Sequence, residues 1–298
     1  MSRTLDYSRL PTERNNAASR DIDRLPVRRI LHIINREDRS VALAVRRALP
    51  ALERAVKLAV AGLRGGGRLF FIGAGTSGRL GVMEAAECPP TFNTPPAMVQ
   101  AIMAGGKMSV FRSKEGAEDR GADAARAMRE KAKRGDVVVG IAASGVTAFV
   151  REGLAAARKK GARTILVTCH PKPPAVAADV VISAPVGPEV IAGSTRLKAA
   201  TATKLILNSL SVATMVQLGK VYGNRMVDLQ PRSRKLVERA VRLVSEIGGV
   251  VPFRARHLLS NAGGNAKTAI VMARARVSRK EARARLAKAN GRLRDALR

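Results

Sequence analysis

The sequence predicts an α/β fold: a doubly wound parallel sheet of about five strands, with helices before it and a small helical subdomain after it. Five short apolar runs, rich in β-branched residues, support this prediction. They occupy residues 68–73, 97–104, 136–144, 163–170 and 179–185. Helical patterns separate several of them. Strands that are apolar throughout and alternate with helices are typical of a parallel sheet covered on both faces.

The segment before the first strand, residues 18–65, has the pattern of two helices. The second, residues 41–63, has apolar positions at helical spacing and is followed by three glycines. Pro50 lies within it and predicts a kink or a split. A further long apolar helix is expected over residues 194–219, after the last strand.

The C-terminal segment, residues 231–298, is helical in pattern throughout, with breaks expected at residues 248–252 and 261–265. The sequence therefore predicts three parts. They are an N-terminal helical arm (residues 1–45), a ligand-binding α/β domain (residues 46–222) and a basic helical C-terminal subdomain (residues 223–298).

Composition limits the class of protein. Of the 298 residues, 46% are hydrophobic, which is enough for a sizeable core. No apolar run reaches about 18 residues, so we expect no membrane span. The N-terminus is polar and lacks a secretory h-region. Two cysteines, Cys88 and Cys169, form no CxxC pair, and the three histidines show no metal-ligand spacing. A cytoplasmic protein without a metal site is expected.

The net charge of +31 raises the possibility of nucleic-acid binding. Residues 223–298 hold 19 Lys and Arg against 5 Asp and Glu. Aromatic residues make up only 3% of the chain, so base-stacking platforms are scarce, and no zinc-finger, RRM or KH signature is present. We therefore expect weak, salt-sensitive attraction to polyanions rather than specific recognition of a nucleic acid.

A glycine loop, GAGTSG at residues 73–78, follows the first strand. It matches GxGxxG, but no acid stands at the end of the next strand to bind a ribose, and no GK[ST] follows. Gly75, Thr76 and Ser77 instead offer backbone N–H groups and two hydroxyls at a helix start. These groups suit a phosphate monoester, although Ser and Thr are also ordinary N-cap residues.

Two more hydroxyl-bearing helix starts follow later strands. Ser144 and Thr147 follow the third strand, and Ser194 and Thr195 precede the long helix. In an open parallel sheet these starts meet at the carboxyl edge, where such folds bind ligands. Loops with more hydroxyls than charges favour a sugar phosphate over a nucleotide.

Several segments resemble the N-acetylmuramic acid 6-phosphate etherases, a family within the sugar-isomerase (SIS) superfamily. The continuation of the glycine loop into AECPPTF is the most specific match, since most sugar-phosphate isomerases share only the loop. The other matching segments are TERNNAASRDIDRL, HIINREDRSV, KEGAEDRG, VVVGIAASG, GPEVIAGSTRLKAATATKLILNSLS, GNRMVDL and NAKTAIVM.

The resemblance implies an SIS-type sheet and a carbon–oxygen lyase that cleaves the D-lactyl ether of N-acetylmuramic acid 6-phosphate to N-acetylglucosamine 6-phosphate and D-lactate. It implies no cofactor and no metal, and a homodimer. It also implies that Glu87 and Glu118 are the catalytic pair. A non-catalytic sugar-phosphate-binding regulator of the glucokinase-regulator type is the alternative, and a polyanion-binding protein using residues 223–298 is a third possibility.

The chemistry of such a reaction needs two proton-transfer groups. If the sugar ring opens, the C2 proton becomes acidic beside the aldehyde, so a base can remove it while lactate leaves from C3. Glu87 precedes Cys88 and Pro89, and the proline predicts that its helix ends near Cys88. Glu84 and Glu115 lie three residues before the two chosen acids, on nearly the same helix faces, and only the resemblance separates them.

Two charged residues complete the expected site. Glu189, in GPEVIAG, is expected to contact the sugar, and Lys198 to neutralise the phosphate or the lactate carboxylate; both could instead be structural or solvated. The family often has Arg-Thr-Pro where this chain has residues 146–148, and Thr where it has Ala192. Both departures fall in expected ligand loops.

Overall fold

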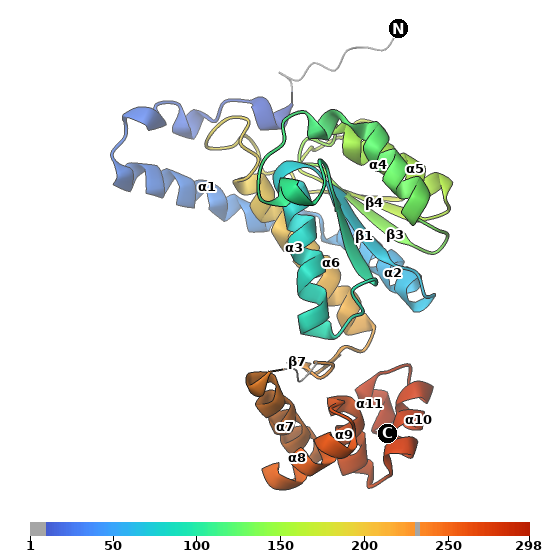
Figure 1. Cartoon of the computed structure of the whole chain (residues 1–298). Helices are drawn as coiled ribbons and strands as arrows, with labels where there is room; N and C mark the ends of the chain where they lie inside the picture. Colours follow the sequence, from blue (N-terminus) through green and yellow to red (C-terminus); the bar gives the residue numbers. More distant parts are fainter. Residues whose placement is uncertain (1–9, 230–232) are drawn as a thin grey trace. The chain divides into compact units, whose positions relative to one another are not determined.

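The computed structural model describes residues 10–229 and 233–298, so the first residues of the predicted C-terminal helical segment lie outside it. The chain divides into two compact units (Figure 1). The first comprises the residues up to Ala85 together with Ala97–Ser211. The second comprises Ala86–Pro96 and Val212–Arg298. The three-part division expected from the sequence stays a prediction.

A five-stranded parallel sheet forms the centre of the first unit, in the order β2-β1-β3-β4-β5. Leu69 of β1 pairs with Val99 of β2 on one side and with Val137 of β3 on the other. The predicted doubly wound α/β fold is confirmed, with every strand inside its predicted run. The strands are β1 (Leu69–Gly73), β2 (Val99–Met103), β3 (Val137–Ile141), β4 (Arg163–Thr168) and β5 (Val180–Ser183).

Helices cover both faces of this sheet. Phe70 and Ile72 of β1 belong to a buried cluster with Leu154, which lies on α5 (Ala148–Lys159), and with residues of α4 (Gly121–Lys131). Phe71 points to the opposite face because side chains alternate along a strand. There it meets Gly81 of α3 so closely that a Cβ at Gly81 would lie 2.9 Å from Phe71 Cβ. The apolar runs of the sequence are thus buried from both sides, as the strand prediction required.

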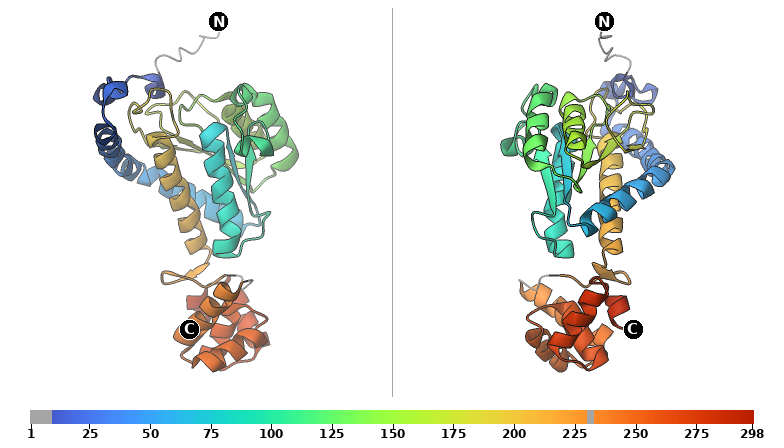
Figure 2. Two further views of the ribbon diagram at one scale, coloured as in Figure 1. Left: turned by 60° about the vertical axis from the view of Figure 1, so that its left-hand side comes forward. Right: turned by 90° about the vertical axis from the view of Figure 1, so that its right-hand side faces the viewer.

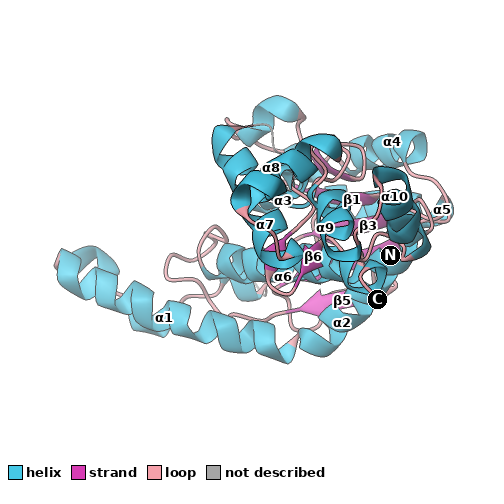
Figure 3. Ribbon diagram, turned by 90° about the horizontal axis from the view of Figure 1, so that it is seen from below, coloured by secondary structure: helices cyan, strands magenta, loops and turns pink. Residues whose placement is uncertain are grey.

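The N-terminal part contains three short 3₁₀ turns, Pro11–Glu13, Ala17–Ser19 and Ile22–Arg24, followed by two α-helices. The split expected at Pro50 is confirmed, because α1 ends at Arg47 and α2 begins at Leu49. Pro50 lies in the first turn of α2, where its missing N–H has no helical partner to lose. The helices are α1 (Val27–Arg47) and α2 (Leu49–Arg64), and α2 lies beside β5 (Figure 3).

The end of α3 (Gly75–Phe92) differs from the sequence prediction, which placed it near Cys88. Pro89 lies inside the helix although it lacks an N–H and crowds the preceding turn. Cys88 and Phe92, four residues apart on one helix face, are both buried, and this packing favours the helical path. Glu87 therefore lies within a helix rather than at its terminus.

Helix α6 (Lys198–Gln217) belongs to the first unit up to Ser211. This part lies beside α3 (Figure 2), and the Asn208 side chain donates to the Glu84 carboxylate at 2.6 Å. By length and composition α6 is apolar enough to cross a membrane. Half of its apolar window is buried inside the protein, and the core helix of a globular protein meets the same criterion.

The second unit is helical and has its own core. The two expected breaks are confirmed: Gly249 closes α7 in a left-handed conformation, and Asn265 caps α9 through its side chain. Val244 and Ile270, both fully buried, belong to one apolar cluster. The elements of the second unit that follow α6 are β6 (Val221–Tyr222), β7 (Arg225–Met226), α7 (Arg234–Gly248), α8 (Pro252–Asn261), α9 (Ala266–Ala275), α10 (Arg279–Lys288) and α11 (Leu293–Ala296).

Candidate active site

A pocket of about 290 Å³ lies where the chain leaves β1 and β3. These strands are neighbours whose onward connections lead to helices on opposite faces, so this is the topological switch point of the sheet. Open α/β sheets bind their ligands at this place. The pocket brings together five of the residues predicted from the sequence: Ser77, Ser144, Thr147, Thr195 and Glu118.

The loop after β1 presents the start of α3 to the pocket. Gly75 opens the helix with φ of +53°, a left-handed conformation that favours glycine. Gly78 packs against the loop so tightly that a Cβ there would come within 2.5 Å of the Gly73 carbonyl oxygen. The N–H groups of the first helical turn have no partners within the helix, so they can bind an anion. Thr76 adjoins Ser77 in this turn.

The loop after β3 presents the start of α5. The Thr168 hydroxyl donates to the Ala143 carbonyl at 3.1 Å and fixes the loop from β4. Thr147 is the N-cap residue of α5, but its side chain makes no capping hydrogen bond. The Thr147 hydroxyl and the first N–H groups of α5 therefore remain free to meet a ligand, and the Ser144 hydroxyl lies in the same pocket.

Among the described residues, three carboxylates line the pocket, and one of them, Glu118, was predicted from the sequence. Glu118 and Asp119 lie in the 3₁₀ turn Ala117–Asp119, on the connection that follows β2. Ala117 is buried in the main core and anchors this turn. Glu13 comes from the N-terminal segment. Its only signal in the sequence was its place in TERNNAASRDIDRL, a segment of the family resemblance.

Glu87 lies on α3, in the stretch that belongs to the second unit, and its side chain is exposed. Its pairing with Glu118 stays a prediction. The rival Glu84 is buried and accepts hydrogen bonds from Asn208 and Ser211 of α6, so its carboxylate already has partners inside the protein. The rival Glu115 is exposed.

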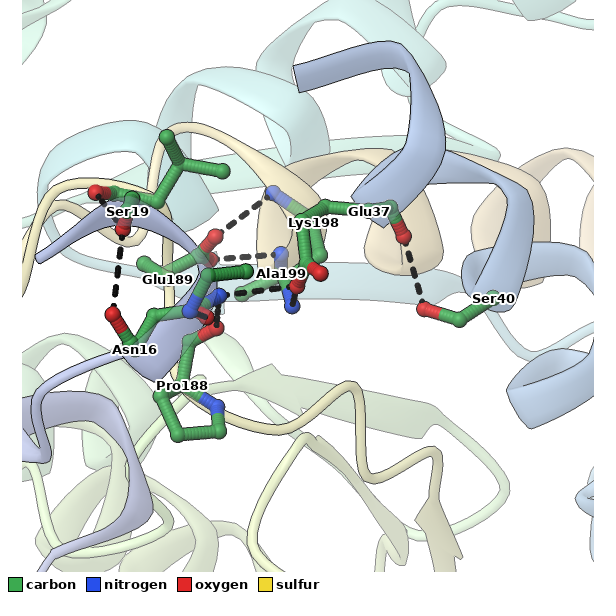
Figure 4. Close-up of polar contacts among 10 residues, drawn as sticks. Asn16, Ser19, Glu37, Ser40, Pro188, Glu189, Lys198 and Ala199 are labelled. Atoms are coloured by element: carbon green, nitrogen blue, oxygen red, sulfur yellow. Dashed lines mark hydrogen bonds and ion pairs between the residues drawn. The ribbon is translucent and has the colours of Figure 1, made fainter. Parts of the chain in front are cut away.

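The start of α6 is closed by the protein itself (Figure 4). The Glu189 carboxylate accepts hydrogen bonds from the backbone N–H groups of Lys198 at 3.0 Å and of Ala199 at 2.9 Å. The Lys198 ammonium lies 2.7 Å from the Glu37 carboxylate, which also accepts from Asn16 at 2.8 Å. We call these five residues the α6 cluster. The substrate contacts predicted for Glu189 and Lys198 stay predictions, and both groups are engaged within the protein.

Burial and hydrogen bonds act against each other in the α6 cluster. Burial raises the pKa of Glu189 above its ordinary value, although the two backbone N–H groups and Lys198 oppose this shift. Burial also acts to raise the pKa of Glu37, but hydrogen bonds from Lys198 and Asn16 and the Lys198 charge outweigh it and lower that pKa. Ser194 lies just before α6 and adjoins Thr195 of the pocket.

A larger pocket, of about 490 Å³, lies on the N-terminal segment. Its lining comes only from residues 17–39 and includes Arg20, Arg29, His32 and Arg36. No loop from the sheet reaches it, so we assign the functional site to the smaller pocket at the switch point. Across residues 10–229 and 233–298, no group of three or more His, Cys, Asp and Glu side chains is placed to hold a metal ion.

Comparison with known proteins identifies the family. The N-acetylmuramic acid 6-phosphate etherase of Symbiobacterium thermophilum is 49% identical over 90% of this chain and 89% of its own length. The etherase of Geobacillus thermodenitrificans is 47% identical over 97% of this chain and 98% of its own. The chain belongs to the N-acetylmuramic acid 6-phosphate etherase family. The resemblance inferred from the sequence segments is therefore confirmed.

Domain-level comparison agrees with this etherase family. Residues 118–213 match the SIS domain, and residues 51–158 match the N-terminal SIS domain of glucokinase regulatory protein. Among solved structures, phosphoheptose isomerase GmhA of Neisseria gonorrhoeae matches 63% of this chain and 97% of its own chain, at 18% identity. The TM-score of this match is 0.48, which is too low to support the family assignment.

Proposed function

We propose that this protein cleaves the D-lactyl ether of N-acetylmuramic acid 6-phosphate, giving N-acetylglucosamine 6-phosphate and D-lactate. The observation that carries the proposal is the identity of 47–50% to etherases over nearly the whole chain. The pocket at the switch point supports it, since it combines hydroxyl-bearing helix starts with carboxylates. A sugar phosphate needs both kinds of group.

The phosphate binds at the starts of α3 and α5. Backbone N–H groups and the hydroxyls of Thr76, Ser77, Ser144 and Thr147 surround it, and the positive ends of two helix dipoles face it. Thr195 and Ser194 meet the same ligand from the loop before α6. Because these contacts hold the phosphoryl group, the sugar carbons extend toward the carboxylates.

The ether is cleaved by elimination followed by addition of water. After the ring opens, Glu118 takes the C2 proton, the electron pair of that bond forms C2=C3, and the C3–O bond breaks. Glu87 gives a proton to the lactate oxygen. Water then adds to C3, and a proton returns to C2. Each positioned acid or base contributes about 10²- to 10⁴-fold to the rate. No organic cofactor takes part in these steps.

The decisive experiment is an assay for free D-lactate after incubation of the full chain with N-acetylmuramic acid 6-phosphate. Release of lactate and N-acetylglucosamine 6-phosphate in equal amounts is expected. The match of residues 51–158 to a regulatory protein makes a non-catalytic sugar-phosphate-binding regulator the second candidate. Tight binding of the sugar phosphate without lactate release would favour the regulator.

We also propose that the protein acts as a homodimer in the cytoplasm. Leu205, Val212 and Val216 recur at helical spacing on α6 and are exposed to 38%, 46% and 42%. Such a stripe on a core helix is suited to a partner helix. Light scattering of the wild-type protein is expected to give twice the chain mass of 31.7 kDa. The Leu205→Lys variant is expected to give a lower measured mass. A monomeric wild-type protein would contradict the proposal.

The basic surface is assigned only a non-specific role. Residues 223–298 carry 19 Lys and Arg against 5 Asp and Glu, so DNA is expected to bind weakly and to be released by salt. Binding measured at two salt concentrations on unrelated DNA sequences tests this. Affinity that survives high salt and depends on sequence would establish a nucleic-acid-binding function.

A further inference from the structure

Glu13 lies in the same pocket as Glu118 but reaches it from the other edge of the sheet. Glu118 stands on the connection that follows β2, one edge strand. Glu13 lies over Gly193, on the connection that follows β5, the other edge strand. The hydroxyl-bearing starts of α3 and α5 come from the central strands β1 and β3. The two carboxylates therefore flank the place assigned to the phosphate.

The protein holds Glu13 in this position. Leu10, just before the short turn, and Thr12, within it, are buried, and the Gly193 N–H donates to the Thr12 carbonyl at 2.8 Å. The Thr12 hydroxyl donates to Glu13 Oε1 at 3.0 Å. At Gly193, with φ of +77°, a Cβ would lie 3.1 Å from Glu13 Oε2, so the glycine leaves room for the carboxylate. Asn16 and Ser19 fasten the following residues to the carbonyls of the 188–190 loop.

Among the described residues, no cationic side chain compensates the charge of Glu13. Glu13 forms no ion pair with any residue that the structure describes, and the described residues lining the pocket include no lysine or arginine. A carboxylate can only accept hydrogen bonds. In a pocket for a phosphate ester, such a group is favourable only where the ligand offers donors, and the hydroxyl and amide N–H groups of an amino sugar are donors.

We propose that Glu13 is a substrate-binding residue that accepts hydrogen bonds from the sugar of a phosphorylated amino sugar, on the side of the pocket opposite Glu118. This inference rests on the proposed function for the class of ligand. Glu13 selects for the sugar, whereas the helix starts of α3 and α5 bind the phosphate. Hydrogen bonds to a charged group contribute about tenfold or more to affinity.

Calorimetry with two probes separates this role from a structural one. Glu13→Gln is expected to weaken binding of N-acetylglucosamine 6-phosphate at least about tenfold and to leave inorganic phosphate binding unchanged. Loss of both affinities together with a lower melting temperature would mean that Glu13 only supports the fold. Unchanged affinity for the sugar phosphate would also overturn the proposal. Asp23→Asn is the matched control and should bind both probes normally, because Asp23 is an exposed acid of the same N-terminal segment, as Glu13 is, but is not among the residues that line the pocket.

The calorimetric test of Glu13 does not depend on whether the protein releases lactate. Lactate release by the wild-type protein tests the proposed function, whereas the ratio of the two affinities tests Glu13. If the wild-type protein binds the sugar phosphate but releases no lactate, Glu13→Gln still decides the role of Glu13. If lactate is released and the variant has wild-type affinity and KM, the role of Glu13 is refuted and the proposed function stands.

Discussion

The starts of α5 and α6 have the same chemistry but are used differently. Each presents backbone N–H groups without helical partners, as every helix start does. At α6 the protein supplies its own anion, because Glu189 accepts from two of these N–H groups and is only 1% exposed. At α5 no side chain caps the helix and Thr147 faces a pocket. The backbone N–H groups of a helix start are thus open to a ligand only where the chain provides no carboxylate of its own.

The two regions also differ in charge balance. The α6 cluster pairs Lys198 with Glu37 and satisfies Glu189 by backbone donors, so its charges are compensated inside the protein. The pocket has three carboxylates and, among the described lining residues, no cation. We therefore expect the charges of the α6 cluster to contribute mainly to stability and the carboxylates of the pocket to contribute to ligand binding or proton transfer. Substitutions in the two regions should therefore have different readouts.

The largest effect is expected for Glu118→Gln in the pocket. Loss of the base should lower the rate of lactate release by about 10²- to 10⁴-fold, while phosphate affinity and the melting temperature stay close to the wild type. Steady-state assays and calorimetry measure the two properties. Glu115→Gln is the matched control, since Glu115 is three residues away and exposed like Glu118 but is not among the residues that line the pocket. Equal activity of both variants would remove Glu118 from the mechanism.

Lys198→Met should act mainly on stability, whereas Glu118→Gln should act mainly on the rate of lactate release. It leaves the Glu37 carboxylate without its cation, and loss of one partner of a buried pair costs about 3 kcal/mol of unfolding free energy. Urea unfolding measures this cost. In the control, Lys57→Met breaks the exposed pair with Glu53 and should change stability by less than about 1 kcal/mol. Similar effects of the two substitutions would show that the α6 cluster is not a stabilising element.

Acid titration should separate the two carboxylates of the α6 cluster. The pKa of Glu37 is lowered, so its stabilising contribution is complete above the ordinary value of 4.5 and is lost as pH falls through the lower folded-state pKa. The pKa of Glu189 is raised, so its contribution has the opposite sign and declines as pH rises through the higher folded-state pKa.

Unfolding free energies measured between about pH 3 and pH 7 test this difference. Glu37→Gln should reduce the loss of stability on the acid side, whereas Glu189→Gln should reduce the loss on the alkaline side. Parallel curves for the two variants would contradict the assigned pKa directions.

The sequence predicted the sheet well because its signal is local. Strands buried on both faces must be apolar throughout, and each of the five runs contained its strand. The end of α3 was predicted wrongly because its position depends on tertiary contacts and not only on the local sequence. A proline biases the residue before it away from the helix, but Cys88 and Phe92 are buried by contacts that a local pattern does not contain.

The site was harder to predict than the fold. Hydroxyl-bearing helix starts are visible in the sequence, and four of their residues line one pocket. Glu13, Glu118 and Glu189 look alike as isolated acids in loops. Only tertiary contacts separate a cap such as Glu189 from pocket-lining groups such as Glu13 and Glu118, and those contacts join residues far apart in the chain.

The smallest effect is expected at Cys169, beside the α6 cluster. Burial, followed by the charge of Glu189, raises the pKa of the Cys169 thiol to about 12. The thiolate is the reactive form, so alkylation of Cys169 by iodoacetamide at neutral pH should be negligible in the folded protein and rapid in urea. Peptide mass spectrometry measures the modified fraction. Glu189→Gln removes the second cause but leaves Cys169 buried, so reactivity should rise only slightly. Rapid labelling of Cys169 in the folded wild-type protein would show that the α6 cluster opens to solvent, and the contrast with the pocket would then be lost.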